Sequence, residues 1–230
     1  MKRVFAFIFA RGGSKGIPRK NLLEIKGITL TRRAIKIAKQ IGEIEKIFLS
    51  TDCEEIQREG ELEEIEVIKR PKELASDNAS EWDAWKHAII CAERIYGKFD
   101  VFVSLPPTAP CRSADDVRRC IASLNDKIDL VFTGTVAKNN PWFNMVKVTE
   151  YGEVSRVIED GGYSRRQDAP QVYNMTTVAY VAKKDFIKEN DNMWSGKSKL
   201  VEVEEETAID IDTIIEFNIA KFLIESCDEG

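Results

Sequence analysis

The sequence predicts an α/β protein built on a doubly wound, mostly parallel sheet. Short, near-continuous apolar segments alternate with segments of helical periodicity up to about residue 135. These apolar segments lack the in-and-out alternation of half-exposed strands, so they suit strands that are buried on both faces. The alternation stops near residue 137, where strand-like segments follow one another without helices between them.

The strands are expected at the apolar segments. "VFAFIFA" at 4–10 begins the series, and further strands are predicted at 46–52, 65–70, 100–105 and 129–135. Polar residues, glycine or proline follow each of them. Because ligands of doubly wound sheets bind at the carboxyl ends of the strands, the candidate site is expected at these junctions.

Helices are expected between the strands, joined to them by right-handed crossovers. "TRRAIKIAKQI" at 31–41 has apolar residues at helical spacing, and 53–64 is a helical segment or a turn. A longer helix is predicted at 80–96 with Ser80 as its N-cap, and another is expected to begin near Ser113.

The region after residue 137 predicts a β-rich excursion from the sheet. Strands are expected at 141–148, 152–158 and 171–183, followed by a loop with two aspartates and an amphipathic terminal helix. We find no internal repeat or linker, and therefore predict one domain over 1–230 with 137–175 as the excursion.

The composition excludes several functions. A net charge of −5 argues against general nucleic-acid or membrane-surface binding, and no apolar run is long enough to cross a bilayer. The N-terminus is a poor signal peptide, so a cytoplasmic location is expected. The five cysteines are scattered and the single histidine is His87, which disfavours a disulfide framework, a histidine-rich zinc site and a serine triad.

A basic, glycine-rich loop follows the first strand. "ARGGSKGIPRKN" at 10–21 has the form of an anion cradle, because glycines allow positive φ or close backbone approach while Arg and Lys donate to phosphate. It matches neither a P-loop nor a dinucleotide fingerprint. Taken alone, it is equally compatible with a solvated basic turn.

Two carboxylates precede the terminal helix. Asp210 and Asp212 flank Ile211, and residues at i and i+2 of an extended segment point the same way. Such a pair suits a hard cation such as Mg²⁺. The alternative is a pair of solvent-facing acids, with Asp212 as the N-cap of the helix.

The order of the motifs resembles the CMP-sialic acid synthetase (acylneuraminate cytidylyltransferase) family. The matching blocks are "RGGSKGIPRKN", "FLSTDCEEI", "KRPKELASDNAS", "LPPTAPCR", "RRQDAPQVY" and "AIDIDTIIEF". They occur in the family's order from residue 5 to about 220. This resemblance implies a nucleotidyltransferase (Rossmann-like) fold and an enzyme that joins CMP from CTP to a nine-carbon 2-keto sugar acid and releases pyrophosphate.

The resemblance also implies roles for individual residues. Catalysis is assigned to Arg11, Lys20, Asp210 and Asp212, and the two aspartates would bind Mg²⁺, with Mn²⁺ as a substitute. Asn21, Arg70 and Ser80 would contact the nucleotide, with Arg11 and Lys20 on its phosphates. The phosphate cradle itself would be Gly12, Gly13, Ser14 and Lys15.

The expected sugar-binding residues are Pro106, Thr108, Arg166, Gln167, Thr176 and Thr177. Two of these positions depart from the family: Pro106 replaces a glutamine, and the Thr176-Thr177 pair replaces Asn-Gly. The resemblance further implies a homodimer built through 137–175, in which Arg166 serves the partner's sugar pocket. Sialic, legionaminic, pseudaminic and other 2-keto acids all remain open.

Two alternatives to this function remain. One is a nucleotidyltransferase of the same fold that uses a Kdo-type acid, a sugar phosphate or another base. The other is a nucleotide-binding homologue that has lost catalysis, which the intact loop and aspartate pair disfavour.

Overall fold

The computed structural model describes residues 2–14 and 16–226. Within them lies a seven-stranded sheet in the order β11-β7-β10-β6-β1-β4-β5. Strand β10 runs antiparallel to both neighbours, whereas the other pairings are parallel, so the predicted mostly parallel sheet is confirmed. The strands are β1 (Val4–Phe9), β4 (Ile44–Thr51), β5 (Glu66–Lys69), β6 (Val101–Ser104), β7 (Leu130–Val136), β10 (Tyr173–Lys183) and β11 (Ser198–Glu202).

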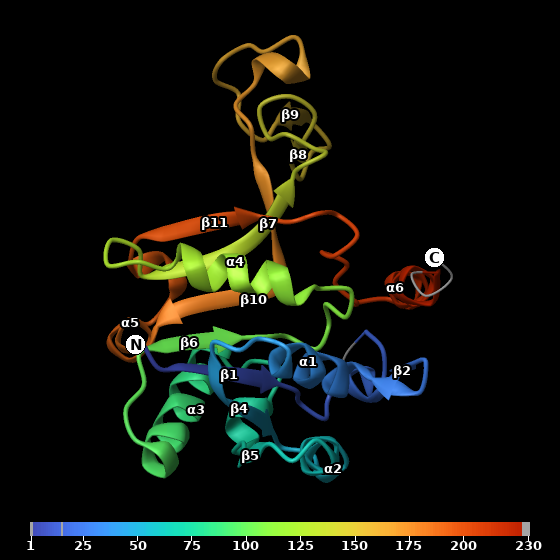
Figure 1. Ribbon diagram of the computed structural model, residues 1–230. Coiled ribbons are helices and arrows are strands. Elements are labelled where there is room, and N and C mark those ends of the chain that lie inside the picture. Colours follow the sequence, from blue (N-terminus) through green and yellow to red (C-terminus); the bar gives the residue numbers. More distant parts are fainter. Residues whose placement is uncertain (1, 15, 227–230) are drawn as a thin grey trace.

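Helices cover both faces of the sheet, as predicted for a doubly wound fold (Figure 1). Alternate residues of β1 enter two different cores: Ala6 packs in a cluster with Ile35, and Phe7 packs in a cluster with Trp85. Ala6 is therefore buried on one face of the sheet and Phe7 on the opposite face. The helices are α1 (Leu30–Lys39), α2 (Glu54–Leu62), α3 (Glu81–Tyr96), α4 (Ala114–Ser123), α5 (Lys184–Glu189) and α6 (Ile214–Ser226).

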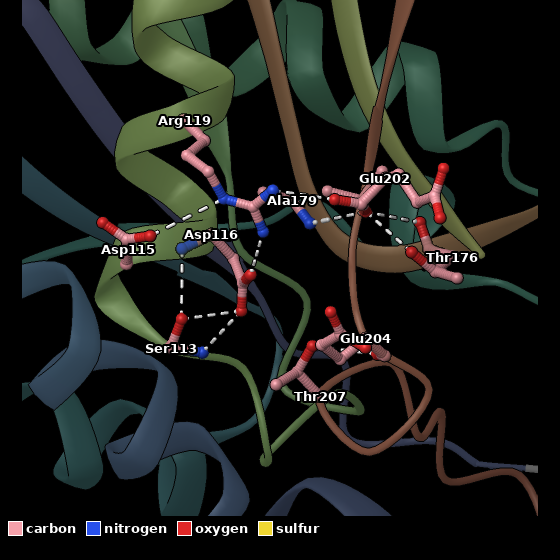
Figure 2. Close-up of polar contacts among 10 residues, drawn as sticks. Ser113, Asp115, Asp116, Arg119, Thr176, Ala179, Glu202, Glu204 and Thr207 are labelled. Atoms are coloured by element: carbon pink, nitrogen blue, oxygen red, sulfur yellow. Dashed lines mark hydrogen bonds and ion pairs between the residues drawn. The ribbon is translucent and has the colours of Figure 1, made fainter.

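The two predicted N-caps differ. Ser113 accepts a hydrogen bond from the backbone N–H of Asp116, whose carboxylate accepts from the N–H of Ser113, and this capping box fixes the start of α4 (Figure 2). Ser80 stands at the N-cap position of α3 but makes no capping hydrogen bond. The predicted N-cap position is therefore confirmed, but the Ser80 side chain does not cap the helix.

Residues 137–172 project from the sheet as an arm between β7 and β10 (Figure 1). The arm contains the antiparallel pair β8 (Val146–Val148) and β9 (Val154–Arg156) and a short 3-10 turn, η3 (Arg166–Asp168). The strand predicted at 141–148 begins later than expected, because the Asn140 side chain accepts a hydrogen bond from the Trp142 N–H and holds a turn.

Several short elements were not predicted. Besides α5 and β11, these are the hairpin β2 (Glu24–Ile25) and β3 (Ile28–Thr29) and the 3-10 turns η1 (Lys20–Leu22), η2 (Lys72–Ala75) and η4 (Met193–Ser195). Among the described residues, none of the helices has both the length and the apolar character needed to cross a bilayer.

Candidate active site

The basic loop after β1 is anchored by two acids. The Arg11 guanidinium lies 2.9 Å from Asp77 Oδ1 and also donates to the Ser76 carbonyl. The Gly12 N–H donates to Asp52 Oδ1 at 2.9 Å. Asp52, which follows β4, and Asp77, which follows η2, thus hold the loop against the ends of neighbouring strands.

The glycines of this loop work through close packing. Gly12 and Gly13 are not among the residues with positive φ, so the expected left-handed conformation is absent at these two described positions. A Cβ on Gly12 would lie 2.9 Å from the Cβ of Cys53, and one on Gly16 would collide with the Asp212 carbonyl oxygen. Lys15, assigned to the cradle, lies outside the described residues.

Lys20 and Asn21 close the loop. Lys20 Nζ lies 2.9 Å from Asp212 Oδ1, and the lysine side chain is 15% exposed. Asn21 is buried, and its amide donates to the Arg11 carbonyl at 3.0 Å. Asn21 therefore shapes the loop that carries Arg11, and Lys20 joins that loop to the carboxylate segment.

Arg70 is a buried cation at the end of β5. Its Nη2 donates to the Ser50 carbonyl at 2.7 Å, its Nε donates to the Ser50 hydroxyl at 3.1 Å, and its guanidinium lies 5.5 Å from the centre of the Phe9 ring. Burial lowers the pKa of Arg70 to about 10, so the side chain stays charged at neutral pH. The structure therefore holds a fixed positive charge beside the basic loop.

These residues surround a cleft of about 390 Å³ at the carboxyl ends of the strands, where a ligand site was predicted. Some of the predicted site residues are not among the described residues that line the cleft, including Gly12, Gly13, Asp210, Thr176 and Thr177. The predicted site residues that line the cleft are Arg11, Ser14, Lys20, Asn21, Arg70, Ser80, Pro106, Thr108 and Asp212.

Asp210 and Asp212 lie on either side of a buried isoleucine, Ile211. Ile211 is fully buried and its N–H donates to the Thr108 carbonyl at 2.8 Å, so Asp210 and Asp212 sit on the opposite side of the segment. Burial raises the pKa of Asp210, and the Asp212 charge raises it further.

Asp212 is exposed and pairs with Lys20, while Glu216 accepts from the N–H groups of Asp212 and Thr213. The alternative in which Asp212 caps the terminal helix is therefore wrong.

A divalent cation fits this carboxylate pair. Asp210 Oδ1 is buried and has no hydrogen-bond partner among the described residues, so it remains available as a ligand. The described residues contain no group of three or more acids, cysteines or histidines that could hold a metal. Two carboxylates completed by phosphate oxygens and water are the usual arrangement for Mg²⁺ and Mn²⁺ at nucleotide sites.

The two threonines of β10 point to different surroundings. Thr176 is buried and its hydroxyl lies 2.7 Å from that of Thr133, a contact that holds an irregular stretch of β10 against β7. The Thr177 hydroxyl is buried near the Asp210 carboxylate and lowers its pKa, without a hydrogen bond of standard geometry. Thr177 thus faces the site, whereas Thr176 supports the sheet.

Arg166 and Gln167 lie in the arm and line a separate hollow of about 330 Å³ with Ala137 and Asn140. Arg166 Nη2 donates to the Ala137 carbonyl at 2.6 Å. The structure therefore does not bring these two predicted sugar-binding residues to the cleft of their own chain.

Two residues of the site region had no assigned role. Glu81, in the first turn of α3, lines the cleft. Arg112 is 3% exposed and lies beneath the loop that carries Pro106 and Thr108. Arg112 could have been singled out because it closes the "LPPTAPCR" block, but its burial has no signal in the sequence.

Transfer of a nucleotidyl group requires positive charge for a triphosphate and carboxylates for a cation on the same cleft. This fold and this cleft define the class of nucleotidyltransferases. A family profile described as Cytidylyltransferase matches residues 5–217. The chain belongs to that family, which includes the CMP-sialic acid synthetases, and the resemblance seen in its motifs is confirmed.

Three relatives illustrate the match. The chain is 32% identical to the post-translational flagellin modification protein B of Campylobacter coli, over 98% of this chain and 96% of that protein. It is also 32% identical to the CMP-N,N'-diacetyllegionaminic acid synthase of Campylobacter jejuni, over 97% and 96%. Identity to the N-acylneuraminate cytidylyltransferase A of Danio rerio is 28%, over 96% of this chain and 50% of that protein.

A solved structure shares the fold. It is a CMP-2-keto-3-deoxy-manno-octonic acid synthetase in complex with CTP, with a TM-score of 0.72 and 15% identity. The likeness covers 97% of this chain and 99% of that chain, so the whole architecture is common to both.

Proposed function

We propose that this enzyme transfers CMP from CTP to a nonulosonate-type 2-keto sugar acid and releases pyrophosphate. The observation that carries the proposal is the meeting of Arg11, Lys20, Arg70 and Asp212 around one cleft. The names of the relatives, which include a legionaminic acid synthase and several N-acylneuraminate cytidylyltransferases, support a sugar acid of this class. A cytoplasmic location stays a prediction.

In the reaction, the anomeric hydroxyl of the sugar acid attacks the α-phosphorus of CTP. The new O–P bond forms, the hydroxyl loses its proton, and the bond to the β-phosphate oxygen breaks. Arg11 and Lys20 neutralise the triphosphate and the developing charge on pyrophosphate. Arg70, after β5, and Ser80, at the start of α3, hold the nucleoside part of CTP.

Asp210 and Asp212 would hold a Mg²⁺ or Mn²⁺ ion, which supplies charge neutralisation and orientation of the phosphates when it is bound. Asp212 lines the cleft and Asp210 stands two residues before it on the same short segment, while Lys20 already balances Asp212. Pro106 and Thr108 line the cleft and, together with Thr177, are proposed to shape the sugar pocket.

The arm is proposed to build a homodimer. Its exposed apolar side chains, in a net acidic soluble fold, suit a contact with a second copy. In such a dimer Arg166 and Gln167 serve the sugar pocket of the partner subunit. The exposed apolar residues of the arm are Met145, Val146, Val148, Tyr151, Val154 and Val157.

The test is a pyrophosphate-release assay with each nucleoside triphosphate over a panel of sialic, legionaminic, pseudaminic and Kdo-type acids, with and without Mg²⁺. Turnover with CTP, Mg²⁺ and a nonulosonate supports the proposal. Turnover confined to another triphosphate, or to a Kdo-type acid, would overturn it.

A further inference from the structure

The 106–109 loop, which lines the sugar side of the cleft, is held from beneath by one side chain. Arg112 Nε donates to the Ala109 carbonyl at 3.0 Å, and its Nη2 donates to the Pro106 carbonyl. With 3% of its surface exposed, Arg112 is almost completely buried. A single planar guanidinium therefore fixes both ends of this loop.

The same loop is hydrogen-bonded to the segment that contains the two aspartates. The Thr108 carbonyl, between the two carbonyls held by Arg112, accepts from the Ile211 N–H at 2.8 Å. Ile211 is buried and its two neighbours are the aspartates. A shift of the loop therefore moves the backbone that carries both carboxylates.

The third nitrogen of Arg112 is not used by the loop. Nη1 is buried and has no hydrogen-bond partner among the described residues, and the same holds for Asp210 Oδ1. Asp210 and Asp116 are the nearby acids whose charges act on Arg112. Asp116 is already held by Ser113 and Arg119 (Figure 2).

We propose that Arg112 is a positioning residue that holds the 106–109 loop against the Ile211 backbone and thereby places the aspartate pair for a divalent cation. This inference rests on the proposed function of the same cleft. It assigns to Arg112 an effect on cation binding that passes through the loop and the Thr108–Ile211 hydrogen bond.

The test compares Arg112→Met, Arg112→Lys and the control Arg119→Met. Arg119 lies on α4 and pairs with Asp115 and Asp116, so the control removes an arginine of this region without touching the loop. The measurement is the Mg²⁺ concentration that gives half of the cation-dependent rise in melting temperature at fixed CTP. We expect an increase of about 10-fold for Arg112→Met, an intermediate one for Arg112→Lys, and none for the control.

A lower melting temperature of Arg112→Met with an unchanged Mg²⁺ requirement would reduce Arg112 to a structural support and overturn the proposal. If Arg112→Met does not fold, Arg112→Lys decides, and a wild-type Mg²⁺ requirement in that variant overturns it. A wild-type protein without any Mg²⁺ response would overturn the metal assignment and this proposal together. Failure of the sugar assignment alone would leave the titration with CTP intact.

Discussion

The ammonium group of Lys20 lies 2.9 Å from Asp212 Oδ1, across 192 residues of sequence. The pair joins the basic loop after β1 to the segment before α6. A divalent cation at the aspartates must therefore bind a carboxylate that already pairs with Lys20, and a triphosphate offers the lysine new partners when the cation arrives.

Lys20→Met should change cation and nucleotide binding in opposite directions. Without CTP, Mg²⁺ binds more tightly because Asp212 has lost its competing partner. CTP binds about 10- to 100-fold more weakly, since a hydrogen bond to a charged group contributes roughly 1.5–3 kcal/mol. Calorimetric titrations measure both. Arg19→Met is the control, because Arg19 is exposed and pairs with Glu55; parallel losses of Mg²⁺ and CTP affinity would contradict the prediction.

Asp210→Asn and Asp212→Asn should each lower turnover by about two orders of magnitude or more while the protein stays folded, because each removes half of the proposed cation ligands. Pyrophosphate release and far-ultraviolet circular dichroism measure the two properties. Near-normal turnover in both variants would mean that the cation is bound elsewhere.

The raised pKa of Asp210 predicts a pH effect on stability. The folded protein binds this proton more tightly than the unfolded chain does, so stability is lost as the pH rises from the unfolded pKa through the folded one. Metal-free Asp210→Asn should therefore melt at a higher temperature than the wild type at pH 7. This difference in melting temperature between the variant and the wild type should become smaller as the pH falls toward about 4. Melting curves of both proteins in EDTA between about pH 4 and pH 7 test this prediction. A difference in melting temperature that does not change with pH would contradict it.

Substitutions of the two threonines should affect different properties, namely stability for Thr176 and sugar preference for Thr177. Thr176→Val removes a buried contact with Thr133 and should lower stability by about 1 kcal/mol with little change in sugar preference. Thr177→Gly combined with Pro106→Gln should alter sugar preference, favouring sialic acid, without changing CTP affinity. Denaturation curves and the sugar panel separate the two effects. An altered sugar preference in Thr176→Val alone would contradict this division.

Val148→Asp should convert the proposed dimer to a monomer and lower turnover with the sugar acid while CTP binding is retained, because it places a charge on the apolar surface of the arm. Leu62→Asp is a matched control: Leu62 on α2 is 66% exposed and Val148 is 65% exposed. Light scattering at micromolar concentration gives the mass. A wild-type monomer, or equal behaviour of the two variants, argues against the arm as the interface.

Much of the fold could be predicted because the parallel strands are buried on both faces. Continuous apolar segments such as Val4–Phe9 report that burial directly. Strand β11 and helix α5 were missed because their segments mix charged and apolar residues and are only partly buried. The antiparallel insertion of β10 between β6 and β7 depends on long-range pairing, which local periodicity does not encode.

The candidate site was predicted from its charged residues and less well from its supporting ones. Arg11, Lys20, Arg70 and Asp212 stand in motifs where charge and spacing are visible, and they line the cleft. The roles of Gly16 and Arg112 depend on which atoms lie beside them after folding. The opposite environments of Asp210 and Asp212 likewise come from tertiary burial and not from their spacing.

The contact between Lys20 and Asp212 has a consequence for biosynthesis. A ribosome makes the basic loop first and reaches its acidic counterpart 192 residues later. Every growing chain therefore carries the nucleotide-facing loop before the carboxylates, and Glu216, which fixes the Asp212 backbone, is made later still. Incomplete chains lack the acidic half of the cleft, so the cell gains the activity only from molecules whose synthesis has passed this segment.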